Sequence, residues 1–196
     1  MKSILAVQIA DKEIIYVDET TVNLWSYRSR CWMPRDNPIK VTLPPKRGHS
    51  VTVIGAISNK RDDFVYMLTK STNKEDCATF LELMRRKWPT SWDAALVWDN
   101  HPSHMSNLVG SVLNEQSLTT LKMPPCSSPL NSIERVWGTM KRYWISHVNE
   151  QAGTIQPADL EANVAKVIDE KIQGKVGNFW KCNLTDCSRV LNGTCV

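Results

Sequence analysis

The sequence predicts an α/β fold in which helices flank a mixed sheet. Two observations indicate this class: β-rich segments cluster in the first part of the chain, and helical and β-rich segments alternate after them. A chain of 196 residues is expected to form one domain that buries roughly two-thirds of its unfolded surface. Its content of 42% hydrophobic and 22% charged residues is typical of globular proteins, and no run reaches the ~20 apolar residues of a membrane helix.

The first half of the chain contains three predicted strands and one predicted helix. EIIYVDET (13–20) is expected to be a buried strand that ends at a carboxylate. Two further β-rich runs follow, HSVTVIGAIS (49–58) and DFVYMLTK (63–70), joined by the polar turn NKRD. NKEDCATFLELMRRKW (73–88) begins with an asparagine cap, has acids in its first turn and basic residues in its last, and is followed by Pro89. These features predict a helix.

The second half alternates between strands and helices. AALVWDN (94–100) is a fourth predicted strand and again ends at an aspartate. SHMSNLVGSVLNEQ (103–116) predicts a helix, and LTTLKMP (118–124) a short fifth strand. PADLEANVAKVIDEKI (157–172) has apolar residues at helical spacing, which predicts the last helix.

Three acidic residues are candidates for a common site. Asp18 and Asp99 follow the apolar parts of predicted strands, and strand ends at one edge of an α/β sheet are where sites collect. Glu134 lies in a predicted helix that Ser132 is expected to cap and that runs to about Ser146. Its neighbours are apolar, so an unpaired carboxylate is unfavourable there. If the three carboxylates converge, their like charges require a cation.

The predicted cation is Mg²⁺ or Mn²⁺, because both prefer oxygen ligands. Three carboxylates without a set of cysteines or histidines favour a two-metal phosphoryl-transfer site, with the ions about 3.5–4 Å apart. One ion would activate an attacking water or 3′-hydroxyl, and the other would stabilise the leaving oxygen. The alternative is that the aspartates are ordinary surface residues at strand ends and that Glu134 faces solvent.

A basic segment could bind a phosphate backbone. The net charge is +4, and residues 28–61 contain eight basic residues against one acidic residue, Asp36. Lys46 and Arg47 in this segment, and Lys122 outside it, are candidate DNA contacts. For each of them the alternative is simple solvation. His104 could contact a scissile phosphate or orient a water, or it could instead hold the loop that follows Asp99.

The six cysteines form no CxxC pair and have no zinc-like spacing with histidine. Three of them cluster near the C-terminus beside the triplets NLT and NGT, which raises the alternative of a secreted protein. The opening MKSILAVQIA would be a minimal signal peptide. We expect reduced, mostly buried thiols in an intracellular protein.

Three ordered blocks resemble the catalytic domain of mariner-type transposases, in the DDE superfamily of endonucleases. The blocks are YVDET, VWDNHPSH and MPPCSSPLNSIERVWGTMKRYW. In the third block the family pattern is Pro-Pro-Tyr-Ser-Pro-x-Leu-Asn-Pro-Ile-Glu-x-x-Trp, and the interval of 34 residues between Asp99 and Glu134 is typical of this family. The residues that match the pattern are Pro124, Pro125, Ser127, Leu130, Asn131, Ile133, Glu134 and Trp137. The similarity covers roughly residues 13–146.

The resemblance implies an RNase H-like fold, with a five-stranded mixed sheet and helices on both faces. It implies that Asp18, Asp99 and Glu134 are the catalytic metal ligands for two Mg²⁺ or Mn²⁺ ions. The implied activity is hydrolytic nicking of DNA, followed by joining of the freed 3′-hydroxyl to a target. The implied location is the nucleus, or the cytoplasm of a prokaryote. On this basis residues 1–150 form the catalytic domain, and residues 151–196 a helical extension of it. The loop between the first two strands also suggests a homodimer.

The chain departs from the family in two respects. Cys126, Ser128 and Ser132 replace the usual Tyr, Pro and Pro, with Pro129 at the variable position. The helix-turn-helix modules that read DNA in the family are absent from this sequence. We therefore expect that the sequence is a fragment, that a partner protein supplies DNA recognition, or that the domain has been domesticated.

Three functions remain open from the sequence. The first is a metal-dependent enzyme that cuts and joins DNA. The second is a domesticated, non-catalytic scaffold or subunit of a larger assembly. The third is a nuclease or RNase H-type hydrolase of the same fold without strand transfer. The membrane is not an expected partner.

Overall fold

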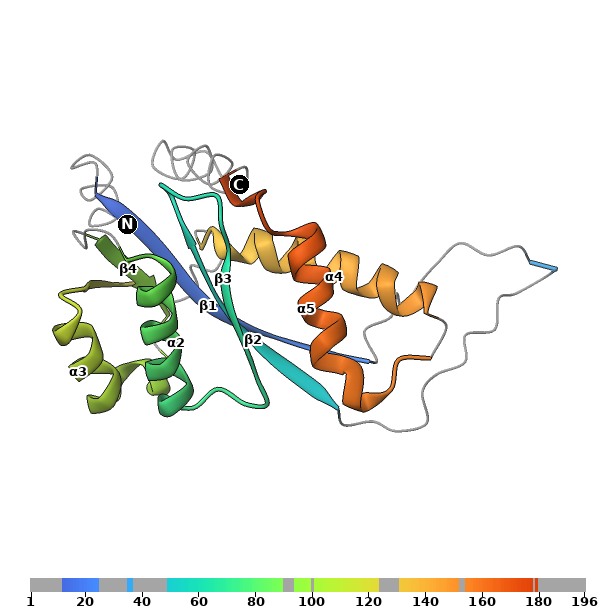
Figure 1. Ribbon diagram of the computed structural model, residues 1–196, viewed down its shortest axis with the longest axis horizontal. Helices are drawn as coiled ribbons and strands as arrows, with labels where there is room; N and C mark the ends of the chain where they lie inside the picture. Colours follow the sequence, from blue (N-terminus) through green and yellow to red (C-terminus); the bar gives the residue numbers. More distant parts are fainter. Residues whose placement is uncertain are drawn as a thin grey trace.

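The computed structural model describes residues 12–24, 35–36, 49–89, 94–99, 101–123, 131–151, 154–177 and 179. In these residues the chain forms one mixed sheet of five strands in the order β3-β2-β1-β4-β5, with helices on both faces (Figure 1). The strands are β1 (Glu13–Asn23), β2 (Ser50–Ser58), β3 (Val65–Thr69), β4 (Ala94–Trp98) and β5 (Thr119–Lys122). The predicted fold class is confirmed.

β1 is the centre of the sheet. It pairs with β2 in the antiparallel sense and with β4 in the parallel sense, and its residues Ile14, Ile15 and Val17 are fully buried. A strand covered on both faces is expected to be apolar at consecutive positions rather than at alternate ones. The run EIIYV therefore belongs at this position in the sheet.

β1 continues beyond Asp18, so the expectation that this strand ends at the carboxylate is wrong. Its antiparallel partner β2 extends the pairing as far as Asn23, which lies opposite Ser50. Its parallel partner β4 stops at Trp98. Asp18 therefore lies within a strand, just beyond the point where one neighbouring strand ends.

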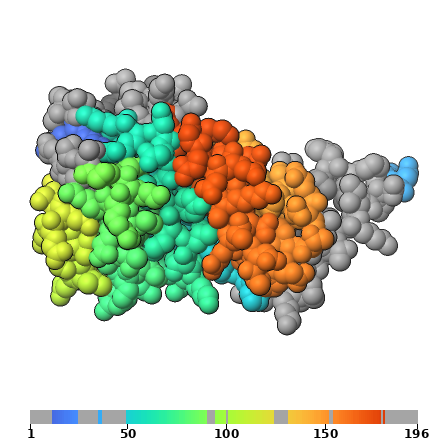
Figure 2. All heavy atoms as spheres, viewed as in Figure 1, coloured from blue at the N-terminus to red at the C-terminus, as the bar shows by residue number. Residues whose placement is uncertain are grey.

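The helices form two layers on opposite faces of the sheet. α2 (Lys74–Lys87) and α3 (Asn107–Glu115) cover the face that includes Ile15 and Val17. α4 (Ile133–Glu150) and α5 (Leu160–Lys171) cover the face that includes Tyr16. Two short 3₁₀ helices, η1 (Pro102–Met105) and η3 (Pro157–Asp159), precede α3 and α5. Figure 2 shows the teal hairpin of β2 and β3 between the green α2 and the red-orange α5.

The helix ends follow the sequence prediction in part. Asn73 caps α2 as predicted, because its Oδ1 accepts a hydrogen bond of 2.8 Å from the backbone N–H of Asp76. Ser132 precedes α4 in a helical conformation, and its side chain makes no capping bond, so that expectation is wrong. α4 also continues to Glu150, beyond the predicted end, because its buried apolar stripe extends to Val148.

The helix of the predicted C-terminal extension packs on the same core as the helix of the third motif block. The buried residues that α5 and the segment after it contribute are Leu160, Val164, Val167, Ile168, Ile172 and Val176. Residues 180–196 lie outside the described part of the chain. Within the described part, no helix combines the length and apolar character needed to cross a membrane.

Candidate active site

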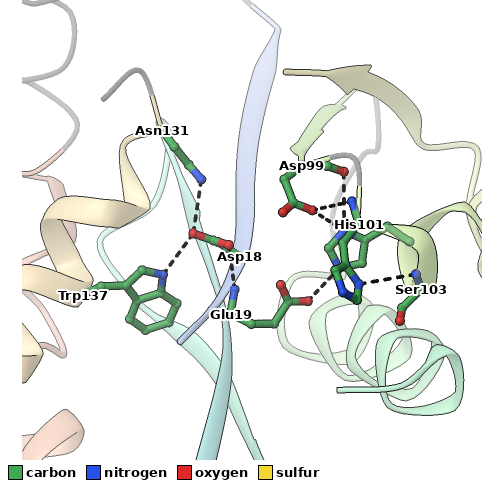
Figure 3. Close-up of polar contacts among 8 residues, drawn as sticks. Asp18, Glu19, Asp99, His101, Ser103, Asn131 and Trp137 are labelled. Atoms are coloured by element: carbon green, nitrogen blue, oxygen red, sulfur yellow. Dashed lines mark hydrogen bonds and ion pairs between the residues drawn. The ribbon is translucent and has the colours of Figure 1, made fainter. Parts of the chain in front are cut away.

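Asp18 is held by residues of the third sequence block. Its Oδ2 accepts hydrogen bonds from the indole Nε1 of Trp137, at 3.3 Å, and from Nδ2 of Asn131, at 3.4 Å (Figure 3). Its Oδ1 accepts a bond of 2.8 Å from the backbone N–H of Glu19. Asn131 lies just before α4, and Trp137 lies in its second turn. The motif LNSIERVW thus supplies two donors that fix the orientation of the first carboxylate.

Gly55 makes room for this arrangement. It lies directly opposite Asp18 in the β1–β2 ladder. A Cβ atom at this position would be 2.6 Å from Cη2 of Trp137 and 2.6 Å from Cζ of Phe64. The two rings pack edge to face, with centroids 5.7 Å apart. The absence of a side chain at Gly55 therefore allows the indole to lie over β2 and reach Asp18.

The electrostatic environment raises the pKa of Asp18 to about 7. Burial is the largest cause, the hydrogen bond from the Glu19 N–H opposes it, and the negative charge of Glu134 raises the pKa further. The influence of Glu134 shows that these two carboxylates share one electrostatic neighbourhood. A nearby divalent cation would favour the ionised form of Asp18.

We expect the stability of the metal-free protein to fall as pH rises from about 4 to about 7. In this interval the unfolded state has already lost the Asp18 proton, whereas the folded state retains it, because the pKa rises from 3.8 to about 7 on folding. This one group would lower the free energy of unfolding by roughly 4 kcal/mol across the interval. Urea denaturation at pH 4.5 to 8 in the presence of EDTA measures the slope. Asp18→Asn should lose this contribution to it, and an unchanged slope in that variant would contradict the assignment.

Asp99 follows β4 at the level of Asp18. The parallel ladder ends at the pair Tyr16–Val97, and Asp18 and Asp99 each lie two residues beyond that pair. The Asp99 carboxylate accepts a hydrogen bond of 2.9 Å from the backbone N–H of His101, and its Oδ1 lies 2.7 Å from Nδ1 of His104. In Figure 3 its side chain therefore lies toward the histidines, whereas Asp18 points toward Trp137.

Glu134 lies in the first turn of α4 and is exposed. A carboxylate at this position is stabilised by the helix dipole. The ligand oxygens of Asp18, Asp99 and Glu134 do not all lie within 4.8 Å of one another, since only one group of described residues meets that criterion and it contains none of the three. The structure thus places the predicted triad around one end of the sheet, without drawing its oxygens into a closed cluster.

The residues around Asp18 nevertheless fit a hard divalent cation. The candidate ligands are all carboxylate oxygens, which Mg²⁺ and Mn²⁺ prefer. The Oδ1 atom of Asn131 is buried and has no hydrogen-bond partner among the described residues, while its amide nitrogen contacts Asp18. The Asn131 oxygen thus lacks a donor, and it lies beside a carboxylate whose pKa is raised. A bound cation would stabilise both groups.

Comparison with protein-family models matches residues 13–155 to the DDE superfamily endonuclease family. The chain belongs to this family. The match spans β1 to the end of α4, and so includes Asp18, Asp99 and Glu134. No curated protein sequence matches the chain significantly.

Solved structures show the same fold as this DDE domain at low sequence identity. A crystal structure of the mariner Mos1 paired-end complex with Mg matches with a TM-score of 0.62 and 17% identity, over 94% of this chain and 59% of that chain. The Mos1 strand transfer complex matches with a TM-score of 0.56 and 16% identity, over 87% and 59%. The catalytic core domain of HTLV-2 integrase in complex with magnesium matches with a TM-score of 0.53 and 10% identity, over 79% and 82%. The chain therefore spans about three-fifths of the length of the Mos1 chains.

The other predicted contacts of the DDE domain are placed as follows. Lys122 is exposed at the end of β5, paired with the residue that precedes Asp99. Lys46 and Arg47 lie outside the described residues. His104 is buried and both of its ring nitrogens have carboxylate partners, so it holds the loop after Asp99. A contact between His104 and DNA would require the ring to leave these partners.

Sequence analysis assigned no role at the site to three residues that the fold brings there. Gly55 and Asn131 support Asp18, as described above. Glu19 adjoins Asp18 in β1 but faces the opposite side of the sheet, where its Oε1 lies 2.7 Å from Nε2 of His104. The alternation of side chains along a strand predicts these opposite directions once β1 is known to continue past Asp18.

Proposed function

We propose that this protein is the catalytic domain of a mariner-type transposase, which cuts DNA and joins 3′-hydroxyl ends by two-metal phosphoryl transfer. The observation that carries the proposal is the environment of Asp18. This carboxylate is largely desolvated and is influenced by Glu134, and it lies on the strand adjacent to Asp99. Membership of the DDE endonuclease family and the order of the three motifs support the assignment.

In the proposed mechanism, Asp18, Asp99 and Glu134 would hold two Mg²⁺ or Mn²⁺ ions. When bound, these ions would activate the attacking water or 3′-hydroxyl and neutralise charge on the phosphoryl group. The role of the protein is to position the carboxylates that would bind the ions. Trp137 and Asn131 orient the Asp18 carboxylate, and the backbone N–H of His101 orients that of Asp99. No covalent intermediate with the protein is required.

The proposed partner is DNA, with a second copy of the chain or another protein supplying sequence recognition. The Mos1 structures that share this fold are transposon-end and strand-transfer complexes. Lys122, at the edge of the sheet near Asp99, is the described candidate for a phosphate contact. If DNA is the substrate, we expect the protein in the nucleus, or in the cytoplasm of a prokaryote.

The direct test is nicking of supercoiled plasmid by the purified protein, with Mg²⁺ or Mn²⁺ and with EDTA as the control. We expect relaxed circles with either ion and none with EDTA. Adding a labelled duplex with a free 3′-hydroxyl then tests joining, and covalent transfer of the label to the plasmid is expected. Nicking without transfer would support the nuclease of the same fold, and no nicking under any condition would contradict the proposal.

One observation favours the non-catalytic scaffold as the second candidate. The three carboxylates do not form a closed cluster, and Asp99 is engaged by His101 and His104 instead. The two candidates differ in their response to metal. A catalytic site predicts that Mg²⁺ raises the melting temperature, and that Asp99→Asn abolishes the rise. A scaffold predicts no rise in either protein.

A further inference from the structure

We propose that Glu19, Cys77 and His104 form a second metal site, which shares no ligand with the predicted two-metal site but contacts it through Asp99, and which is suited to Zn²⁺. Their ligand atoms, a carboxylate oxygen, a thiol sulfur and an imidazole nitrogen, all lie within 4.8 Å of one another. The three residues come from β1, α2 and η1, and the spacing of cysteine and histidine in the sequence gives no sign of this convergence. The site goes beyond the proposed transposase activity and does not depend on it.

The three ligand atoms lie close enough together for a small displacement to admit a zinc ion. Zinc binds sulfur at about 2.3 Å and nitrogen or oxygen at about 2.0–2.2 Å, so ligand atoms of a tetrahedral site stand roughly 3.3–3.8 Å apart. The Nε2 atom of His104 and Oε1 of Glu19 are 2.7 Å apart, so they need to separate by less than about 1 Å. Cys77 is fully buried, and the side chain of His104 is 3% exposed. The ligands are thus already held in place by the core.

The donor set selects a transition metal over Mg²⁺. A thiolate, an imidazole and one carboxylate are the three ligand types found in zinc sites, whereas Mg²⁺ prefers oxygen alone. Three protein ligands would leave a fourth position for water. Binding would form Zn–S, Zn–N and Zn–O bonds, with the protons on Sγ of Cys77 and Nε2 of His104 released to solvent.

The surroundings of His104 match those of a metal-bound histidine. Ligating histidines usually donate their other ring N–H to a carboxylate, which fixes the tautomer and the ring orientation. Here Nδ1 of His104 lies 2.7 Å from Oδ1 of Asp99. The indole of Trp98 stacks on the imidazole, with centroids 3.9 Å apart and planes inclined by 26°. The ring therefore presents Nε2 to Glu19 and Cys77 in a fixed direction.

The competing explanation is a hydrogen-bonded cluster in which a protonated His104 bridges the carboxylates of Glu19 and Asp99. Burial lowers the pKa of His104, but hydrogen bonds to Cys77 and Glu19 outweigh it and raise the pKa to about 10, so the ring is protonated when no metal is bound. In this explanation Cys77 is a hydrogen-bond partner of His104. In the zinc site its sulfur would bind the metal directly, so the effect of Cys77 on metal binding separates the two explanations.

The test compares zinc binding by the wild-type chain and by Cys77→Ser. Each protein is stripped with a chelator and titrated with Zn²⁺ against a chromophoric competitor. Wild type is expected to bind one more equivalent of zinc than Cys77→Ser, and zinc should raise the melting temperature of wild type more than that of the variant. In wild type, Co²⁺ should give a sulfur-to-cobalt charge-transfer band in the near ultraviolet, and this band should be lost in Cys77→Ser.

Two controls keep the result specific. The double variant Cys182→Ser/Cys187→Ser removes thiols elsewhere in the chain and should retain the additional equivalent and the cobalt band. Asp18→Asn alters the proposed two-metal site and should also retain them, so the two proposals can fail separately. Equal zinc binding by wild type and Cys77→Ser, or no binding by either, would overturn the zinc site. Equal melting temperatures of the two metal-free proteins verify that Cys77→Ser is folded.

Discussion

Asp18→Asn is expected to abolish metal-dependent nicking and, at the same time, to stabilise the metal-free protein. The amide cannot bind a divalent cation as a carboxylate does, so nicking should fall by about a hundredfold to a thousandfold, the range for losing one group that stabilises a transition state. The free energy of unfolding at pH 8 should rise by about 1–3 kcal/mol. The ionised carboxylate costs roughly 4 kcal/mol in its buried position. Part of this gain is offset because the NH₂ group of the amide replaces one of the two oxygens that accept hydrogen bonds from Glu19, Asn131 and Trp137.

Opposite effects on activity and stability distinguish a functional carboxylate from a structural one. Urea denaturation at pH 8 with EDTA measures stability, and plasmid nicking with Mg²⁺ measures activity. Asp169→Asn is the matched control, because Asp169 is exposed on α5 and hydrogen-bonded to the hydroxyl of Tyr66. It should leave nicking unchanged. If Asp18→Asn instead destabilised the protein at pH 8, the ionised carboxylate would be stabilising the fold. That result would contradict the raised pKa of Asp18.

Gly55→Ala is expected to destabilise the protein and to impair catalysis through Trp137. The new Cβ would lie 2.6 Å from two aromatic rings that pack between β2 and α4, so at least one ring must move. Overpacking of this kind costs about 1–3 kcal/mol. Displacement of Trp137 also removes a donor from Asp18, which should raise its pKa further and weaken metal binding.

Gly138→Ala is the matched control for this substitution. Gly138 follows Trp137 in α4, and nothing lies within 4 Å of a Cβ built there. An alanine in the helix interior should stabilise the protein by about 0.5–1 kcal/mol. Urea midpoints measure both effects, and the Mg²⁺ concentration needed for half-maximal nicking reports on Asp18. If Gly55→Ala were as well tolerated as Gly138→Ala, the close approach of Trp137 to β2 would not be a constraint on the site.

Sequence analysis predicted the elements whose signals are local. The cap at Asn73 and the apolar run of the central strand depend on neighbours a few residues away, and the structure has both. The three motif blocks predicted the family, and the family model spans them. The errors concerned the ends of elements, which depend on contacts with residues distant in sequence. β2 extends β1 past Asp18, and the apolar stripe that packs on the core extends α4 to Glu150.

The sequence alone determined the family, the α/β class and the identity of the candidate acids, because ordered motifs and periodicity are properties of the chain itself. Only the tertiary structure decided which side chains meet. Trp137 reaches Asp18 across 119 residues of sequence, and Glu19 reaches His104 across 85. Cys77 joins Glu19 and His104 by the packing of α2 on the sheet. Such contacts depend on strand register and helix packing, which are set by the whole core and leave no local pattern around the residues concerned.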